Sequence, residues 1–405
     1  MKRFFVLALL ALLISPAHAE PNKQVLAEAE RQQPAALKLW ERLVNIDSGT
    51  GDAEGLVRVG AIAVDELRRL GMDVEILPSR PAVGDNIVAT VTGTGKGKIL
   101  LMAHMDTVFP KGTAAARPFR IEGGRAYGPG VSDDKGGIVA AIGALNILKT
   151  LKFADYARIT LFLNTNEETG SRGSRALIEK LAKEHHVALN LESGRAPDGL
   201  VIRRKGSARL TIEVKGRSAH AGVAPDQGRN AAMELAHQVM NIAKLGNPDK
   251  ETTVNVTVLQ SGDRANVIPD VAVAQADVRA LVTAEFDRIE REATELARNN
   301  KLIPDTTVTV TMNRGFPVMD RNAETDRLAT MAQSIYAELG KTLRLESSGG
   351  AADSSLSAGV FTPTLDGLGL IGGNAHTDRE FAEVGSIVPR FYLLTRLLME
   401  LGKGK

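Results

Sequence analysis

Residues 99–106 read ILLMAHMD, an apolar run that ends in a histidine and an aspartate. A short, continuous apolar run is typical of a strand buried on both faces, as in a parallel sheet covered by helices. Residues 159–164 (ITLFLN) and 187–191 (VALNL) repeat this pattern, and a helical pattern over residues 136–151 separates the first strand from the second. Strands that alternate with helices predict an α/β fold with a mostly parallel sheet flanked by helices.

The chain before this run begins with helices and continues with short strands. Over residues 24–70, apolar residues recur every three to four positions, which predicts helices, and Gly71 ends the last of them. Residues 74–77 and 86–91 are rich in strand-forming residues and predict two further strands. These elements form the first part of the expected α/β domain.

The pattern changes after Lys205. The following segment predicts the order strand, helix, strand, strand, helix, strand, which is that of a ferredoxin-like sandwich. The expected elements are residues 208–214, 230–242, 253–260, 271–280, 285–299 and 306–312. We therefore expect an inserted α+β domain over residues 208–315 within an α/β domain formed by residues 20–207 and 316–405. The basic residues 203–205 at the junction are interpreted as a solvated hinge.

The first nineteen residues have the features of a secretory signal peptide. Lys2 and Arg3 precede an apolar run over residues 4–14, and residues 17–19 (AHA) match a cleavage site. An uncleaved anchor is the alternative, but the run is short for a bilayer. We expect an exported protein, periplasmic or secreted, with no membrane segment after cleavage. Lys2 and Arg3 account for the formal net charge of +2, so charge gives no reason to expect a nucleic-acid partner.

Histidines and acidic residues follow the ends of the expected strands. They are His104 and Asp106, Asp133 and Asp134 before a helix, Glu167 and Glu168, Glu192, and His376 in a glycine-rich loop. Because the carboxyl ends of parallel strands meet at one edge of a sheet, we expect most of these side chains to gather there. Taken singly, each has an ordinary explanation as a surface residue, a helix cap or a solvated loop. Together, carboxylates beside histidines favour a site where a cation neutralises them.

The sequence contains no cysteine, which excludes disulfides, thiolate metal sites and cysteine nucleophiles. Nitrogen and carboxylate ligands suit Zn²⁺, Mn²⁺ or Co²⁺. Two histidines with three carboxylates exceed what one open catalytic zinc needs, and they fit two metals that share a bridging carboxylate. One carboxylate then remains for proton transfer.

These motifs, taken in order along the chain, resemble the dinuclear zinc aminoacylase/carboxypeptidase family of metallopeptidases. The motifs are His104-x-Asp106, GPGVSDDKGG around Asp133, the Glu167-Glu168 pair, Glu192 and His376. The resemblance extends over nearly the whole chain after residue 19. Within the family it is strongest to exported bacterial glutamate carboxypeptidases of the folate-cleaving, glucarpidase type. That likeness lies in residues 43–55, 84–88, 104–108 and 126–130.

The resemblance implies a dizinc site, with two Zn²⁺ per subunit and Co²⁺ or Mn²⁺ as alternatives. The implied ligands are His104 and Glu192 for one ion, Glu168 and His376 for the other, and Asp133 as the bridge. Glu167 would serve as the general base, and Asp106 would orient the His104 ring. The peptide bond between Asp133 and Asp134 is expected to be cis.

The resemblance also implies roles for the inserted domain. The domain would form a homodimer interface and a lid, and His220, in GRSAHAG, would reach the active site of the partner to stabilise the oxyanion. Asn266 and Arg279 match positions that bind the substrate carboxylate in relatives, and Arg314 is a further candidate. Each arginine has a surface position as its alternative interpretation.

We expect an exported dizinc metallo-carboxypeptidase that releases a C-terminal amino acid, with glutamate from peptides or folate-like N-acyl conjugates as the preferred product. An N-acyl-amino-acid deacylase or a dipeptidase with the same metal site is the main alternative. An exported solute-binding protein is a third interpretation, but it leaves the clustered carboxylates unexplained.

Overall fold

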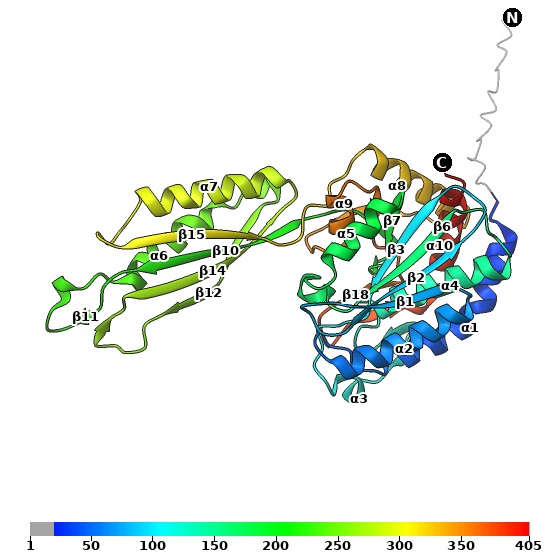
Figure 1. Cartoon of the computed structure of the whole chain (residues 1–405), viewed down its shortest axis with the longest axis horizontal. Coiled ribbons are helices and arrows are strands. Elements are labelled where there is room, and N and C mark those ends of the chain that lie inside the picture. The colour runs from blue at the N-terminus through cyan, green and yellow to red at the C-terminus, as the bar shows by residue number, and fades with distance from the viewer. Residues whose placement is uncertain (1–19, 405) are drawn as a thin grey trace, which may run out of the picture.

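The computed structural model describes residues 20–404, so the predicted signal peptide at residues 1–19 lies outside the described residues (Figure 1). The main sheet has six strands in the order β1-β2-β6-β3-β7-β17. Their bounds are Asp73–Pro78, Asp85–Thr92, Arg158–Asn164, Lys98–His104, Val187–Asn190 and Thr364–Leu365. Strands β6, β3, β7 and β17 run parallel, while β1 and β2 form an antiparallel edge. The predicted α/β class is confirmed.

Helices cover both faces of this sheet, as the apolar runs predict. Alternate residues of β3 belong to two separate cores: Leu101 packs with the helices of one face, and Leu100 with those of the other. The first face carries α1 (Lys23–Val44), α2 (Ala53–Arg69), α4 (Lys135–Thr150), α8 (Ala323–Ala337) and α10 (Ile387–Gly402). The second face carries α5 (Arg175–Glu184) and α9 (Asp353–Gly359). Burial on both faces explains why β3 is apolar throughout.

A second sheet, which the sequence patterns do not predict, lies beside the first. It has the order β16-β9-β8-β18-β19-β5-β4. The strand bounds are Arg344–Ser348, Gly199–Arg204, Gly194–Arg195, Ile371–Gly373, Phe381–Glu383, Arg125–Tyr127 and Arg120–Glu122. Most of these strands are too short to show a period in the sequence. The pairing of β18 with β19 fixes both ends of the loop between them.

The inserted segment forms a separate unit that projects from the main unit (Figure 1). Its sheet has the antiparallel order β12-β14-β10-β15, which agrees with the predicted ferredoxin-like arrangement. The strands are β10 (Gly206–Lys215), β12 (Thr253–Ser261), β14 (Val271–Ala280) and β15 (Thr307–Arg314). Helices α6 (Ala231–Ile242) and α7 (Thr283–Asn299) pack on one face of this sheet and share one apolar core with it. Among residues 20–404, no helix is both long and apolar enough to cross a bilayer.

Candidate metal centre

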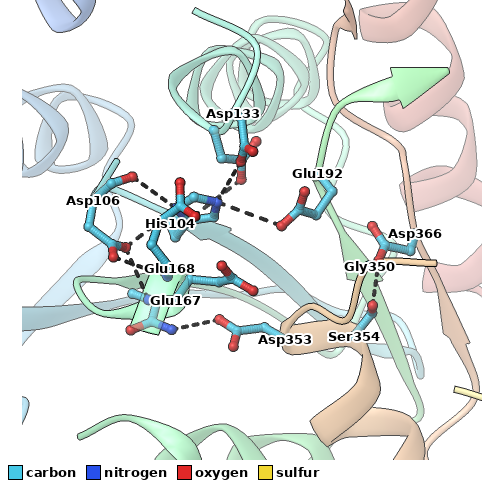
Figure 2. A network of polar contacts seen from close by, with 12 residues as sticks. His104, Asp106, Asp133, Glu167, Glu168, Glu192, Gly350, Asp353, Ser354 and Asp366 are labelled. Atoms are coloured by element: carbon cyan, nitrogen blue, oxygen red, sulfur yellow. Dashed lines mark hydrogen bonds and ion pairs between the residues drawn. The ribbon is translucent and has the colours of Figure 1, made fainter. Parts of the chain in front are cut away.

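The topology brings the predicted metal ligands together at the carboxyl edge of the main sheet. Strand β3 ends at His104, and the short 3-10 helix Glu167–Thr169 follows the end of β6. Glu192 lies just after β7, and Asp133 lies just before α4 (Figure 2). The loop between β18 and β19 supplies His376. Residues far apart in the sequence therefore meet because parallel strands end at the same edge.

The two oxygens of Asp133 face two different histidines. His104 Nε2 lies 3.0 Å from Asp133 Oδ1 and 3.6 Å from Glu192 Oε1. His376 Nε2 lies 3.2 Å from Asp133 Oδ2 and 3.0 Å from Glu168 Oε2. The arrangement thus consists of two ligand groups that share one carboxylate, which is the donor geometry of a dinuclear site.

The chemistry of these donors fits a cation. Burial raises the pKa of Glu168, and the neighbouring Asp133 carboxylate raises it further. Burial alone would lower the pKa of His104, but hydrogen bonds to Asp106, Asp133 and Glu192 outweigh burial and hold this pKa well above its usual value. So many facing carboxylates require a compensating charge. Ligand atoms of His104, Asp133 and Glu168 all lie within 4.8 Å of one another, as do those of His104, Glu167 and Glu192.

Asp106 connects the His104 ring with the turn that carries both glutamates. His104 Nδ1 lies 3.0 Å from the main-chain oxygen of Asp106 and 3.4 Å from its Oδ1. The Asp106 carboxylate accepts hydrogen bonds from the Thr50 hydroxyl at 2.6 Å and from the backbone N–H groups of Glu167 and Glu168 at 3.1 and 3.2 Å. Asp106 therefore contacts the ring mainly through its main chain and uses its carboxylate to hold the glutamate turn.

Glu167, the predicted general base, has a buried carboxylate beside the predicted metal ligands. Its side chain is 8% exposed and lines a cleft between the main unit and the inserted unit. Burial raises the pKa of Glu167 well above its usual value; the positive charge of His104 lowers it, whereas Glu192 and Asp353 raise it. A raised pKa brings a carboxylate closer to the neutral range in which a general base and acid works best.

Glu380 is a buried site residue that sequence reasoning missed. Its carboxylate accepts hydrogen bonds from the backbone N–H groups of Gly130, Ser132 and Asp133 at 3.0, 2.8 and 3.0 Å, and from the Ser132 hydroxyl at 3.1 Å. Glu380 therefore joins the His376 loop to the loop of the shared carboxylate. Its position four residues after His376 is the only signal in the sequence. The peptide bond between Asp133 and Asp134 is cis, as the family resemblance implies.

The interpretation of residues 203–205 as a solvated hinge is wrong for Arg204, whose side chain is 3% exposed. Arg204 Nε donates to Asp366 Oδ2 at 2.5 Å, and Nη2 lies 3.8 Å from Glu192 Oε2. Asp366 also accepts a hydrogen bond from Ser354 (Figure 2). Arg204 thus lies beside the candidate ligand Glu192. Its acidic partners Asp366 and Glu192 explain how its charge is tolerated inside the protein.

The cleft has a volume of about 920 Å³ and places Glu167, Glu168 and His376 opposite the inserted unit. Of the predicted substrate residues, Arg279 and Arg314 line this cleft. Both already have acidic partners in the chain. Arg279 Nε lies 2.9 Å from Asp277 Oδ1, and Arg314 Nη2 lies 2.9 Å from both Asp287 and Glu290 on α7.

His220 and Asn266 do not meet the metal ligands of the same chain. His220 lies in β11 (Ala219–His220), at the end of the inserted unit that is remote from the main unit (Figure 1). β11 pairs with β13 (Val267–Ile268), and the backbone oxygen of Asn266 accepts a hydrogen bond from Ala221 N at 2.9 Å. The two residues thus share one exposed tip, outside the residues that line the cleft.

Comparison with known proteins identifies a family and several relatives of this chain. The family model described as Peptidase family M20/M25/M40 matches residues 100–400. The chain is 39% identical to carboxypeptidase G2 of Pseudomonas sp. (strain RS-16), over 98% of this chain and 96% of that protein. It is 31% identical to acetylornithine deacetylase of Myxococcus xanthus, over 45% of this chain and 50% of the other. The structure of aminopeptidase PepT from Bacillus cereus ATCC 10987 has the same fold, with a TM-score of 0.79, 24% identity and coverage of 91% of this chain and 98% of that one.

Proposed function

The chain belongs to peptidase family M20/M25/M40, as its motifs predict, and from this premise we propose that it cleaves the amide bond that joins a C-terminal amino acid to a peptidyl or N-acyl group. Members of this family are metallopeptidases, so the chain is a hydrolase. The similarity to carboxypeptidase G2 over nearly the full length supports release of a C-terminal residue, with glutamate as the proposed product. Membership in a peptidase family leaves the solute-binding interpretation without support.

The proposed metal centre would hold two Zn²⁺ ions. His104 and Glu192 would bind one ion, Glu168 and His376 the other, and Asp133 both. Bound ions of this kind lower the pKa of a shared water and polarise a scissile carbonyl. The observation that carries the proposal is that the two oxygens of Asp133 face His104 and His376 at 3.0 and 3.2 Å.

Glu167 performs the proton transfers in this proposal. Its carboxylate accepts the proton of the attacking water and delivers it to the leaving nitrogen, so the nitrogen leaves as a neutral amine and not as an anion. The Asp106 carboxylate holds the backbone N–H of Glu167 at 3.1 Å and so keeps this base fixed beside the metal ligands. The raised pKa of Glu167, which burial causes, suits both halves of the transfer.

Substrate binding involves the inserted unit. We assign the C-terminal carboxylate of the substrate to Arg279 or Arg314, which line the cleft. His220 and Asn266 lie at a tip far from the metal ligands of their own chain, so we propose that they serve the cleft of a second copy in a homodimer. His220 would then donate to the developing oxyanion. The signal-like residues 1–19 support export to the periplasm or medium.

A deacylase is the second candidate, because the chain is also similar to acetylornithine deacetylase. Both candidates use the same metal centre and differ in which side of the amide is recognised. Product analysis distinguishes them. The zinc-loaded protein is assayed on folate-like glutamate conjugates, dipeptides and N-acetyl amino acids, with and without a chelator.

We expect free glutamate from the conjugates, loss of activity with chelator, and recovery when zinc is added back. Hydrolysis of N-acetyl amino acids alone would favour the deacylase. Full activity in protein shown to be free of transition metal would contradict the metal centre.

A further inference from the structure

One face of the inserted sheet is polar and is not covered by helices. Along β14 the residues alternate, so that Ala276 and Val278 pack against the helices while Gln275, Asp277 and Arg279 lie on the other face. Arg209 of β10 is on that same face, because it pairs directly with Asp277. Arg209, Gln275, Asp277 and Arg279 all line the cleft opposite Glu167. The substrate would therefore face this sheet while its amide lies at the metal ligands.

The arginines of the cleft differ in whether their charge is neutralised. Arg279 is bound to the Asp277 carboxylate through contacts of 2.9 and 3.1 Å, and Arg314 is bound to two acidic residues of α7. Arg172 and Arg209 line the same cleft, and within residues 20–404 neither has an ion pair or hydrogen bond through its side chain. Because Asp277 is already engaged by Arg279, the charge of the adjacent Arg209 remains available.

Arg172 projects from a loop that is fixed on both sides. Ser171 has a φ of 53°, its N–H donates to the backbone oxygen of Asn166 at 2.8 Å, and its hydroxyl donates to the buried Asp353. On the other side, the N–H of Gly173 donates to Asn166 Oδ1 at 2.9 Å. A side chain at Gly173 would meet the backbone oxygen of Ser79 at 2.0 Å. The chain thus holds Arg172 at the cleft although its own side chain is exposed.

We propose that Arg172 and Arg209 form a subsite for a second carboxylate of the substrate, in addition to the C-terminal carboxylate. This inference rests on the proposed function. Arg172 belongs to the main unit and Arg209 to the inserted unit, so one anionic group between them would be held from both sides of the cleft. A guanidinium group makes two parallel charge-assisted bonds to a carboxylate, and an amide cannot replace that partner. The second carboxylate belongs either to the side chain of the released amino acid or to the acyl part.

Two matched pairs of substrates locate this carboxylate. Benzoyl-glutamate and benzoyl-glutamine differ only at the side chain of the released residue. Succinyl-leucine and its succinamoyl analogue differ only in the acyl part. The zinc-loaded wild-type protein should prefer the acidic member of one pair. That pair shows whether the second carboxylate belongs to the released amino acid or to the acyl part.

The variants Arg172→Gln and Arg209→Gln then test the subsite. Each should lower kcat/KM for the preferred acidic substrate by about 10- to 100-fold, the usual effect of losing a charge-assisted hydrogen bond, and leave the neutral partner nearly unchanged. Arg172→Lys and Arg209→Lys should recover part of the loss. Arg298→Gln, on the outer helix α7, removes a positive charge away from the cleft and should leave kcat/KM unchanged for both substrates. Equal losses on both members of a pair, or no loss, would overturn the subsite.

A binding measurement separates this inference from the proposed function. If none of the four substrates is hydrolysed, calorimetry compares glutamate with glutamine, and succinate with succinamate, as ligands of the zinc-loaded protein. Tighter binding of one dicarboxylate, lost in Arg209→Gln, would support the subsite while the proposed hydrolysis fails. Indifference of the wild-type protein to the second carboxylate would overturn the subsite.

Discussion

The candidate functional side chains of the main unit and of the inserted unit differ in their burial and in the number of their partners. In the main unit the side chains are buried and held by several partners: His104 is 2% exposed and contacts Asp106, Asp133 and Glu192. In the inserted unit, His220 and Arg209 are exposed and have few or no side-chain partners among the described residues. The difference leads us to propose that the fold itself positions the candidate metal ligands, whereas the recognition groups of the inserted unit acquire their partners from a substrate or a second copy.

Among the predicted effects, replacement of the proposed base Glu167 in the main unit should give the largest loss of turnover. Glu167→Gln removes the proton acceptor but keeps the size of the side chain, so we expect turnover to fall by about 10³- to 10⁴-fold while the metal content stays unchanged. Metal analysis by mass spectrometry and steady-state kinetics measure the two quantities. Loss of both metal ions in this variant would instead make Glu167 a ligand.

Replacement of His220 tests the inserted unit in the same assay. His220→Ala should lower kcat by about 10²- to 10³-fold, the effect of removing one oxyanion donor, with no change in metal content. Mixing His220→Ala with Glu167→Gln under conditions that exchange subunits should restore activity, because one cleft of the mixed dimer then has both groups. Activity that stays low after exchange has been verified would contradict action across the dimer.

Replacement of Glu380 tests whether the candidate metal ligands depend on buried hydrogen bonds from a residue outside the ligand set. Glu380→Ala leaves three backbone N–H groups and the Ser132 hydroxyl without their acceptor. We expect zinc affinity to fall by about 10- to 100-fold and the free energy of unfolding to fall by about 3 kcal/mol. Chelator titration and denaturant unfolding measure these effects.

The neighbouring Glu383→Ala is the matched control for Glu380→Ala. It breaks only the partly exposed pair with Arg125 and should cost less than about 1 kcal/mol. If both variants behaved alike, the special role of Glu380 would be refuted.

His185 should affect only the stability of the fold, because it lies away from the metal ligands. Burial lowers its pKa to about 4, and its ring contacts Leu181 O at 2.6 Å and Thr160 Oγ1 at 3.0 Å. The unfolded chain therefore takes up the proton first as the pH falls. Between pH 6.5 and 4 this residue should reduce the free energy of unfolding by at most about 3 kcal/mol.

The measurement for His185 compares the pH dependence of denaturant unfolding in wild type and variants. His185→Gln should remove this part of the dependence on acid, whereas His186→Gln, at an exposed neighbour, should retain it. An unchanged pH profile in His185→Gln would contradict the buried neutral imidazole.

The same contrast explains what could be predicted from the sequence. His104, Glu167 and Glu192 could be placed because each follows the end of an apolar strand, and parallel strands bring such ends together. Glu380 and Arg204 could not, because their burial depends on contacts with residues far away in the chain, such as Ser132 and Asp366. Most strands of the second sheet escaped prediction because strands of two or three residues show no period.

The unequal exposure of the two histidines would make the two proposed metal ions differ in how long they stay bound. His104 is 2% exposed, whereas His376 is 55% exposed and lies at φ 65° in the loop after β18. An ion held by Glu168 and His376 would therefore have a ligand that can detach toward solvent, whereas an ion held by His104 would have a ligand that is almost fully buried. We expect the ion at His376 to exchange first, so brief chelation should yield a protein with one metal whose remaining ion leaves much more slowly.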